Sequence, residues 1–448
     1  VRGELMQKVG NKPYISVNYT FDGLTPAGLP EDLCYKLNQY YEQKLRQDKT
    51  AHDKIEFEII FNTYDFMTDT RLKELAEYGF DDVEISQLRN ALFEIAKQTL
   101  EHYDEICEED LRSLGQLTEL RNELRKHAPL AETNVMKLYS YIDELLDSIK
   151  DHGTPQFTRQ ARCAFMARSF CRTLVEKGYF TKQEMDDFML SIPTVASEFE
   201  RDFDLYSHGK LSRDDFNHLY GHLRLGTYDI RSDSYRNIYF DVASANLTGN
   251  NKVKQEAKSL DLERLQVALD EAGIPVTPEK FIEFIKKATQ NREYFKFEFT
   301  KSLSLMLDVI VKLGEVMAIA REDMSYLEIQ DLLSYHSRDS YIQTIETRRR
   351  FYHVNSYLVL PEVIFDVGDI DVIDIDEARP NFITNKVVEA PIVNLDEDHD
   401  SDITGKIVVL TKADPGYDWI FAKDIAGFVT KYGGAASHMA IRCAEFGI

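Results

Sequence analysis

A nearly uninterrupted helical pattern runs through the middle of this chain, from about residue 69 to residue 345. Proline is rare there, and apolar residues recur at intervals of three and four, which places them on one side of a helix. The clearest stretch is residues 294–320, whose apolar stripe consists of Phe295, Phe299, Leu303, Met306, Ile310, Leu313 and Met317. Outside this stripe lie Lys296, Glu298, Lys301 and Asp308. The pattern predicts one large helical domain, with a later helix opened by a capping box at Ser325–Glu328.

Both flanks of this region mix strands with helices. Before it, the pattern predicts strands at residues 14–17 and 55–61 and an amphipathic helix at residues 31–46. After residue 352 it predicts the following elements: strands at 358–365, 407–410 and 425–430, a strand pair within 381–395, and helices at 415–423 and about 436–446. The predicted fold class is therefore mostly α, with a small α/β part at the C-terminal end.

Composition argues against several kinds of partner. The chain has 448 residues, with 53 basic and 77 acidic side chains and a net charge of −24. A surface this acidic repels nucleic acid and anionic membranes, so we expect neither as a partner. Five cysteines without C-x-x-C spacing, and no visible signal peptide, predict a reduced cytoplasmic protein without structural zinc. The most apolar helical stretch is interrupted by Asp308, Lys312 and Glu315, so it is not expected to span a membrane.

The strongest chemical signal lies close to the C-terminal end. Gly433 and Gly434 follow a predicted strand, and Ser437 and His438 come at the start of a predicted helix. Glycines allow a tight turn and a close backbone approach, and a helix start offers unpaired N–H groups that suit an anion. An imidazole at that position can attack a phosphoryl group and later release it. Ser437 is either a helix cap or a phosphate ligand, and the alternative for the whole motif is an ordinary helix start.

The wider string favours the phosphate carrier. Residues 427–441, GFVTKYGGAASHMAI, closely resemble the phosphohistidine signature of the phosphoenolpyruvate-utilising mobile domain. That domain occurs in phosphoenolpyruvate synthase, pyruvate phosphate dikinase and rifampin phosphotransferase. The resemblance implies a swivelling β/β/α domain in which His438 carries the phosphate, Thr430 lies beside it, and the backbone of Gly433 and Gly434 cradles the phosphate.

One departure from that signature concerns an arginine. The family pattern has arginine six residues after the histidine, where this chain has Ala444, whereas Arg442 stands four residues after His438. That spacing puts Arg442 on the same helix face as the histidine. Arg442 therefore offers charge to the carried phosphate or to a docking partner, or it is a solvated helix arginine.

A looser resemblance covers residues 220–230, YGHLRLGTYDI, which are similar to a Gly-His-Arg string in the helical substrate domain of rifampin phosphotransferase-like proteins. It implies an acceptor pocket in a loop between helices, with a histidine as general base on an acceptor hydroxyl. The acceptor-binding residues would be His222, Arg224, Tyr228 and Asp229, with His222 as the base. The alternative is an ordinary turn, with Gly226 in a left-handed conformation and Asp229 as a cap.

The resemblance also implies a nucleotide domain outside this chain. No glycine-rich phosphate loop is found here, and no metal site is predicted. In the family, ATP and Mg²⁺ bind an N-terminal ATP-grasp domain, which would precede residue 1. Residues 1–65 would then be a connecting α/β segment, residues 66–352 the helical acceptor domain, and residues 353–448 a linker and a partial swivelling domain. We expect such a fragment to lack ATP turnover by itself.

The expected function is that of an ATP-dependent phosphotransferase that passes a phosphoryl group through His438 to a small-molecule acceptor. The expected partners are that acceptor and the protein's own ATP-grasp domain, and a homodimer stays open. Two alternatives remain. One is phosphoenolpyruvate synthase proper, with pyruvate as the acceptor at a separate C-terminal barrel. The other is a non-catalytic helical scaffold with a vestigial carrier motif.

Overall fold

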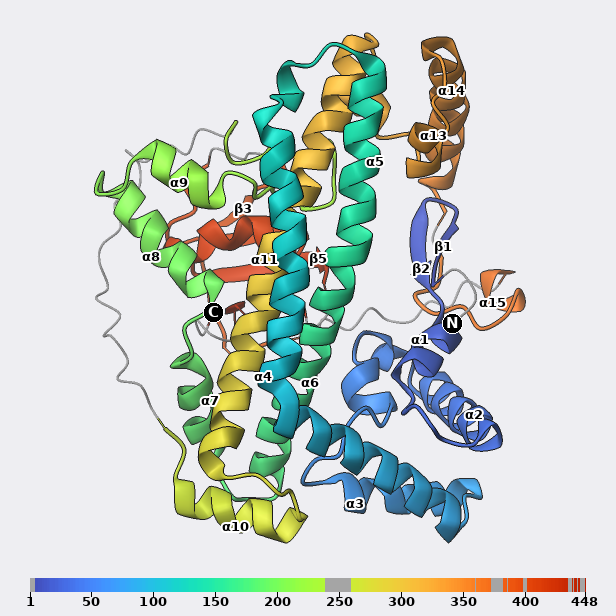
Figure 1. The fold of residues 1–448 in the computed structure, drawn as a ribbon, viewed down its shortest axis with the longest axis vertical. Helices are drawn as coiled ribbons and strands as arrows, with labels where there is room; N and C mark the ends of the chain where they lie inside the picture. Colours follow the sequence, from blue (N-terminus) through green and yellow to red (C-terminus); the bar gives the residue numbers. More distant parts are fainter. Residues whose placement is uncertain are drawn as a thin grey trace.

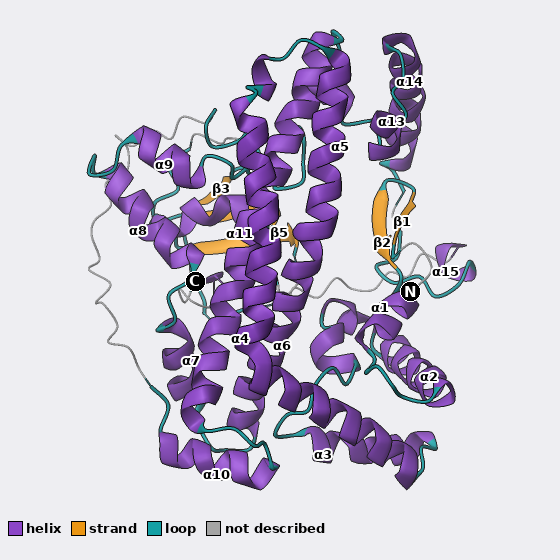
Figure 2. Ribbon diagram, viewed as in Figure 1, coloured by secondary structure: helices purple, strands orange, loops and turns teal. Residues whose placement is uncertain are grey.

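The computed structural model describes the following residues: 5–237, 259–358, 360–371, 382–384, 386–397, 401–433, 437, 439–440, 442–443 and 448. Within them the chain is mostly helical, and a small parallel sheet with its own helix lies at the C-terminal end (Figure 2). This confirms the predicted fold class. No helix in these parts of the chain is long and apolar enough to cross a bilayer.

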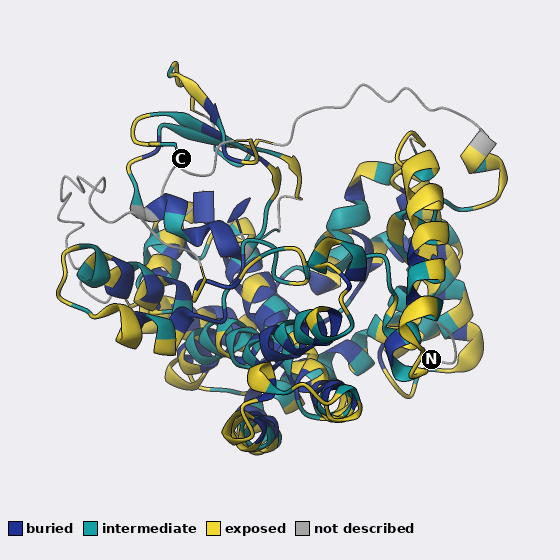
Figure 3. Cartoon of the chain, turned by 90° about the horizontal axis from the view of Figure 1, so that it is seen from above, coloured by how far each residue is buried: buried dark blue, intermediate teal, exposed yellow. Residues whose placement is uncertain are grey.

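Four long helices form the centre of the molecule. They are α4 (Asp82–Lys126), α5 (Val135–His152), α6 (Thr154–Glu176) and α11 (Pro278–Val316), and α11 packs against the other three (Figure 1). In the view along this bundle, the faces that the helices turn toward each other are buried and their outer faces are exposed (Figure 3). The α11 stripe follows this rule, since Phe295, Phe299, Met306, Ile310 and Leu313 are all buried.

Two hydrophobic clusters fill the bundle. The first joins α1 (Val17–Leu24), α2 (Glu31–Gln47) and α10 (Leu262–Ala272) to α4, α6 and the first half of α11. The second joins the later half of α11 to α5 and to α14 (Arg338–Asn355). The helices near the N-terminus therefore share one core with the bundle. The helix predicted at residues 31–46 is confirmed by α2.

The remaining helices are short. In chain order they are η1 (Lys49–Asp53), η2 (Ile55–Ile59), α3 (Thr68–Arg71), η3 (Leu72–Tyr78), η4 (Pro129–Ala131), α7 (Lys182–Leu190), α8 (Val195–Ser207), α9 (Arg213–Tyr220), α12 (Arg321–Met324), α13 (Ile329–Leu333) and α15 (Gly368–Asp371). Of these, α8 and α9 lead the chain to the loop at residues 221–227.

Two local predictions in the helical part are wrong. The strand predicted at residues 55–61 is the π-helix η2, which packs the Phe57 ring edge-on against Phe165 of α6 at 5.4 Å between centroids. The capping box predicted to open at Ser325 is absent, because the Ser325 hydroxyl bonds back to the carbonyl of Glu322 at 2.6 Å. The box forms three residues later, where Glu328 caps α13.

A hairpin near the N-terminus meets a late segment of the chain. β1 (Met6–Val9) and β2 (Lys12–Ile15) pair antiparallel, so the strand predicted at residues 14–17 begins and ends earlier than expected. The Tyr14 hydroxyl donates to the carbonyl of Pro361 at 2.6 Å. The strand predicted at residues 358–365 is wrong for residues 358 and 360–365, which form no strand, and Val363 packs into the first hydrophobic cluster instead.

The C-terminal unit is a three-stranded parallel sheet in the order β3-β4-β5, made of β3 (Ile392–Asn394), β4 (Ile407–Lys412) and β5 (Gly427–Tyr432). The 3-10 helix η6 (Pro415–Ala422) connects β4 to β5. These elements confirm the predictions at 407–410, 415–423 and 425–430. Of the strand pair predicted within 381–395, the described residues contain only β3.

Candidate functional site

The turn after β5 brings two hydroxyl side chains together around a glycine. Gly433 has φ +146°, and a Cβ there would lie 2.6 Å from the Cβ of Ala413. It would lie 3.5 Å from both Thr430 Oγ1 and Ser437 Oγ. The turn therefore requires glycine, and its backbone passes directly beside both hydroxyl groups.

The helix of the motif begins with a side-chain cap. Ser437 Oγ accepts a hydrogen bond from the backbone N–H of Ala440 at 3.3 Å, which satisfies one of the unpaired donors of a helix start. His438, which follows Ser437 directly, and Gly434, which precedes it, both lie outside the described residues. Their predicted roles as phosphate carrier and phosphate cradle stay predictions.

Arg442, in contrast, is held against the helical part of the chain. It is 5% exposed and forms an ion pair with Glu200 of α8. Its Nε lies 3.9 Å from a carboxylate oxygen of Asp418 in η6, and its guanidinium lies 5.8 Å from the centre of the Phe421 ring. The alternative of a solvated helix arginine is therefore wrong.

The same face of the C-terminal unit docks on the loop after α9. The backbone N–H and the hydroxyl of Thr227 donate to the Asp414 carboxylate at 3.1 and 2.8 Å. The buried Tyr235 hydroxyl donates to the carbonyl of Gly416. A Cβ at Gly416 would lie 1.8 Å from the carbonyl oxygen of Arg224, so only glycine permits this approach.

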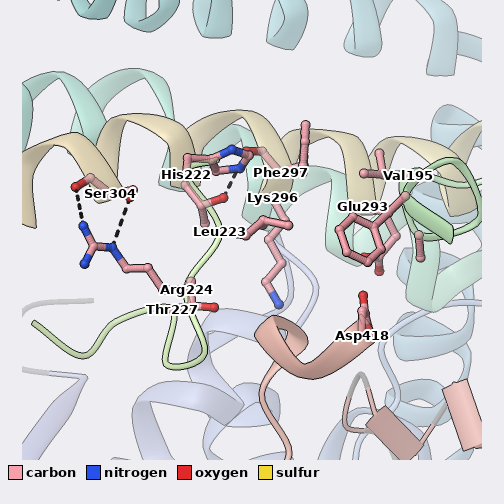
Figure 4. Close-up of a pocket in the computed structure, with 13 residues that line it drawn as sticks. Val195, His222, Leu223, Arg224, Thr227, Glu293, Lys296, Phe297, Ser304 and Asp418 are labelled. Atoms are coloured by element: carbon pink, nitrogen blue, oxygen red, sulfur yellow. Dashed lines mark hydrogen bonds between the residues drawn. The ribbon is translucent and has the colours of Figure 1, made fainter. Parts of the chain in front are cut away.

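A cavity of about 70 Å³ lies where the two units meet. Its walls come from α8, the loop at residues 221–227, α11 and η6, and include the apolar side chains of Val195, Phe199 and Phe297. Lys296 extends from α11 into this space, and Asp418 points toward α11 from the opposite side (Figure 4). An apolar wall with a few converging polar groups is typical of small-molecule sites.

His222 forms part of this wall and is nine-tenths buried, with 7% of its surface exposed. Its ring contacts Phe297 edge-on at 4.6 Å between centroids. Among the residues that the structure describes, its Nε2 has no hydrogen-bond partner. Burial, reinforced by the nearby charge of Lys301 and Arg121, lowers the pKa of His222 well below its ordinary value. The imidazole is therefore neutral near pH 7, and the lowered pKa makes it a weaker base than an exposed histidine.

Arg224 also borders the cavity, but its guanidinium is bonded to protein groups. It is 2% exposed and forms an ion pair with Asp308. Its nitrogens donate to the Ser304 hydroxyl and carbonyl, both at 3.1 Å, and to the carbonyl of Ser232 at 2.6 Å. These bonds fix the loop on α11. Arg224 therefore helps to shape the cavity wall, while its guanidinium is engaged by protein groups.

The other two predicted acceptor residues do not line the cavity. Tyr228 is 63% exposed. Burial opposes ionisation of Asp229, but the hydrogen bonds from Arg231, one of them at 2.7 Å, outweigh it and lower the pKa of Asp229. Asp229 caps a turn by accepting from the backbone N–H of Arg231 at 3.0 Å. Gly226 is not left-handed as one alternative predicted; a Cβ there would lie 2.8 Å from Ser232 Oγ.

Several cavity residues were missed from the sequence. Lys296 and Glu293 stand one helical turn apart on α11, outside its apolar stripe, and neither was among the predicted acceptor-binding residues. Lys296 is half-buried, and in the described parts of the chain it has no hydrogen bond or ion pair. The sequence did offer one signal. Polar residues in the middle of α11, on the side away from its apolar stripe, indicate that a second part of the protein or a ligand contacts that side.

Comparison with known proteins gives one match. Residues 403–448 match the family model described as the mobile domain of PEP-utilising enzymes. No curated protein and no solved structure matches the chain significantly. The C-terminal unit, from the loop before β4 onward, is therefore similar to the mobile domain of phosphohistidine-carrying PEP-utilising enzymes.

Proposed function

We propose that this chain is part of a phosphotransferase in which His438 carries a phosphoryl group to a small-molecule acceptor bound between the two units. The observation that carries the proposal is the docking of the mobile-domain unit on the helical part, with a partly apolar cavity at the contact. Docking through Thr227 and Asp414 supports a productive arrangement, because it aligns the two units on either side of that cavity.

The reaction proposed for the cavity is transfer of the phosphoryl group from His438 to an acceptor hydroxyl. The bond between phosphorus and the histidine nitrogen breaks, a bond to the acceptor oxygen forms, and the hydroxyl proton leaves. His222, whose imidazole is neutral, is the proposed acceptor of that proton. The ammonium group of Lys296 is suited to stabilise the charge on the phosphoryl oxygens, because phosphoryl transfer depends mainly on positioning and electrostatics.

ATP, with Mg²⁺, is the proposed phosphate donor on the basis of the sequence resemblance. The described residues contain no group of three or more His, Cys, Asp or Glu side chains that could hold a metal ion. No step of the transfer is assigned to the ion. Donor binding is proposed for a separate ATP-grasp domain.

Labelled ATP tests the first half of the reaction. The native protein containing this chain is incubated with ATP labelled at its β- and γ-phosphates, and the protein-bound label is tested for acid lability and base stability. We expect such label on wild-type protein and none on His438→Ala or His438→Gln. An acceptor screen by mass spectrometry then looks for AMP release coupled to a phosphorylated product.

Folding is controlled by comparing the thermal unfolding of all three proteins. Wild-type protein that stays unlabelled, or a His438→Gln variant that is folded and still labelled, would refute the carrier role.

A further inference from the structure

A second, smaller cavity lies against the other side of the His222 region. Its volume is about 10 Å³, which is room for about one water-sized group. Three cations line it, namely Arg125 near the end of α4, Arg236 in the loop after α9 and Lys301 on α11, together with one carboxylate, that of Asp308 on α11. His222 and Ser304 line both cavities, so the two meet at these side chains.

Among the residues that the structure describes, positive charge at this cavity exceeds the negative charge that could balance it. In the described parts of the chain, the side chains of Arg125 and Arg236 have no hydrogen bond or ion pair. The nearby carboxylates are already engaged. Glu298 pairs with both Arg121 and Lys301, and Asp308 pairs with Arg224. This cationic excess stands out in a chain with a net charge of −24.

The electrostatics of the neighbouring groups favour a bound anion. Partial burial of its guanidinium lowers the pKa of Arg125, and the charges of Arg236 and Arg121 lower it further. The same cations help to lower the pKa of His222, whose buried Nε2 has no hydrogen-bond partner in the described structure. Like charges held this close repel one another unless an anion lies between them.

The backbone is shaped so that Arg236 can reach this place. A Cβ at Gly221 would lie 2.7 Å from Cγ of Arg236, so the absence of a side chain there lets the arginine lie against the loop. The backbone N–H of Arg236 donates to the carbonyl of Gly221 at 3.3 Å, which fixes the two segments together. Both Arg125 and Arg236 are exposed, so the cavity is reached from solvent at their end.

We propose that Arg125, Arg236 and Lys301 form an oxyanion site at the solvent end of this cavity, which binds a carboxylate or phosphate group of the acceptor with one oxygen inside the cavity, toward His222. The assignment to the acceptor rests on the proposed function, whereas the anion site itself does not. Guanidinium groups bind such oxyanions through paired hydrogen bonds. The acceptor is thus an anionic molecule whose less polar, hydroxyl-bearing part lies in the larger cavity.

Anion binding at this position also changes the pKa of His222, the proposed general base. An anion that neutralises the surrounding cations weakens the repulsion that keeps the imidazole uncharged, so the pKa of His222 rises toward its ordinary range. A base with a higher pKa takes the hydroxyl proton more readily. The histidine then becomes an effective base only when the acceptor is in place.

Calorimetric titration at low ionic strength tests the site, with inorganic phosphate and, separately, acetate as probes. The whole chain is used, as wild type and as Arg125→Gln, Arg236→Gln and the double variant. We expect saturable binding of at least one probe by wild type, weakened about tenfold by each single substitution and more by the double one. Which probe binds more tightly identifies the acceptor group as a phosphate or a carboxylate.

Arg112→Gln is the matched control, since Arg112 is an exposed arginine on the same helix and does not line either cavity. It should bind the probes as wild type does. The His438→Ala variant should bind them equally well, so failure of the carrier proposal and failure of the anion site are seen separately. The inference is overturned if wild type binds neither probe saturably, or if the double variant binds as tightly as Arg112→Gln does.

Discussion

Removing the carboxylate of Glu200 tests how the C-terminal unit is held on the helical part. The side chain of Arg442 is 6% exposed and that of Glu200 is 25% exposed. Removing one partner of a buried ion pair costs about 3–5 kcal/mol. Glu200 keeps some contact with water, and Asp418 stays 3.9 Å from Nε of Arg442, so we place Glu200→Gln below that range, at about 2 kcal/mol. This loss lowers the docking constant about 30-fold.

Hydrogen exchange at one amide reports on docking directly. The N–H of Thr227 donates across the contact to Asp414 at 3.1 Å, so its exchange requires the two units to separate or the loop to open. In Glu200→Gln we expect this amide to exchange about 30-fold faster, in step with the weaker docking constant. The control is Glu198→Gln, because Glu198 is an exposed carboxylate on the same helix.

The reasoning is refuted if Thr227 exchanges equally fast in wild type, Glu200→Gln and Glu198→Gln. A double-mutant cycle adds a second condition. Arg442→Met combined with Glu200→Gln should cost less than the two single effects together, since the interaction they share is lost only once.

Three further predictions follow from single positions. Gly416→Ala should separate the units more strongly than Glu200→Gln, because its Cβ would lie 1.8 Å from the carbonyl oxygen of Arg224; exchange at the loop amides measures this. Gly433→Ala should destabilise the C-terminal unit by about 1–3 kcal/mol in thermal unfolding, since φ is +146° there and the new Cβ would lie 2.6 Å from Ala413 Cβ. The third concerns acid. Because folding holds the pKa of His222 well below 6.5, the unfolded chain binds a proton first, and stability is lost as the pH falls below about 6.5. Urea unfolding at about pH 7.5 and about pH 5.5 should show a larger loss in wild type than in His222→Gln.

Long amphipathic helices were predictable from the sequence because their burial follows a simple period. The stripe on α11 includes Phe295 and Leu313, which the structure buries fully. Short apolar runs were less predictable. The alternation Ile55–Ile59 is equally compatible with a strand and with one wide π-helical turn, and the contact between Phe57 and Phe165 on α6 favours the turn. Such a contact depends on residues far along the chain.

Candidate site residues were predictable only where a short string contains them. Gly433 and Ser437 belong to one motif, and the structure brings both beside Thr430. The cavity is different, because Phe199, His222, Lys296 and Asp418 come from four elements separated in sequence. Only His222 stood in a recognisable string. The others look like surface or core positions until the fold places them around one space.

Transfer from the phosphorylated protein to its acceptor tests the central proposal most directly. Protein labelled on His438 is freed of nucleotide, mixed with the acceptor found by screening, and followed for loss of label from the protein and gain by the acceptor. We expect wild type to transfer its label, and Lys296→Met to become labelled normally but to transfer about 100-fold more slowly, as expected for loss of one group that stabilises the developing charge. The proposal is contradicted if His438 never acquires label, or if Lys296→Met passes it on as fast as wild type.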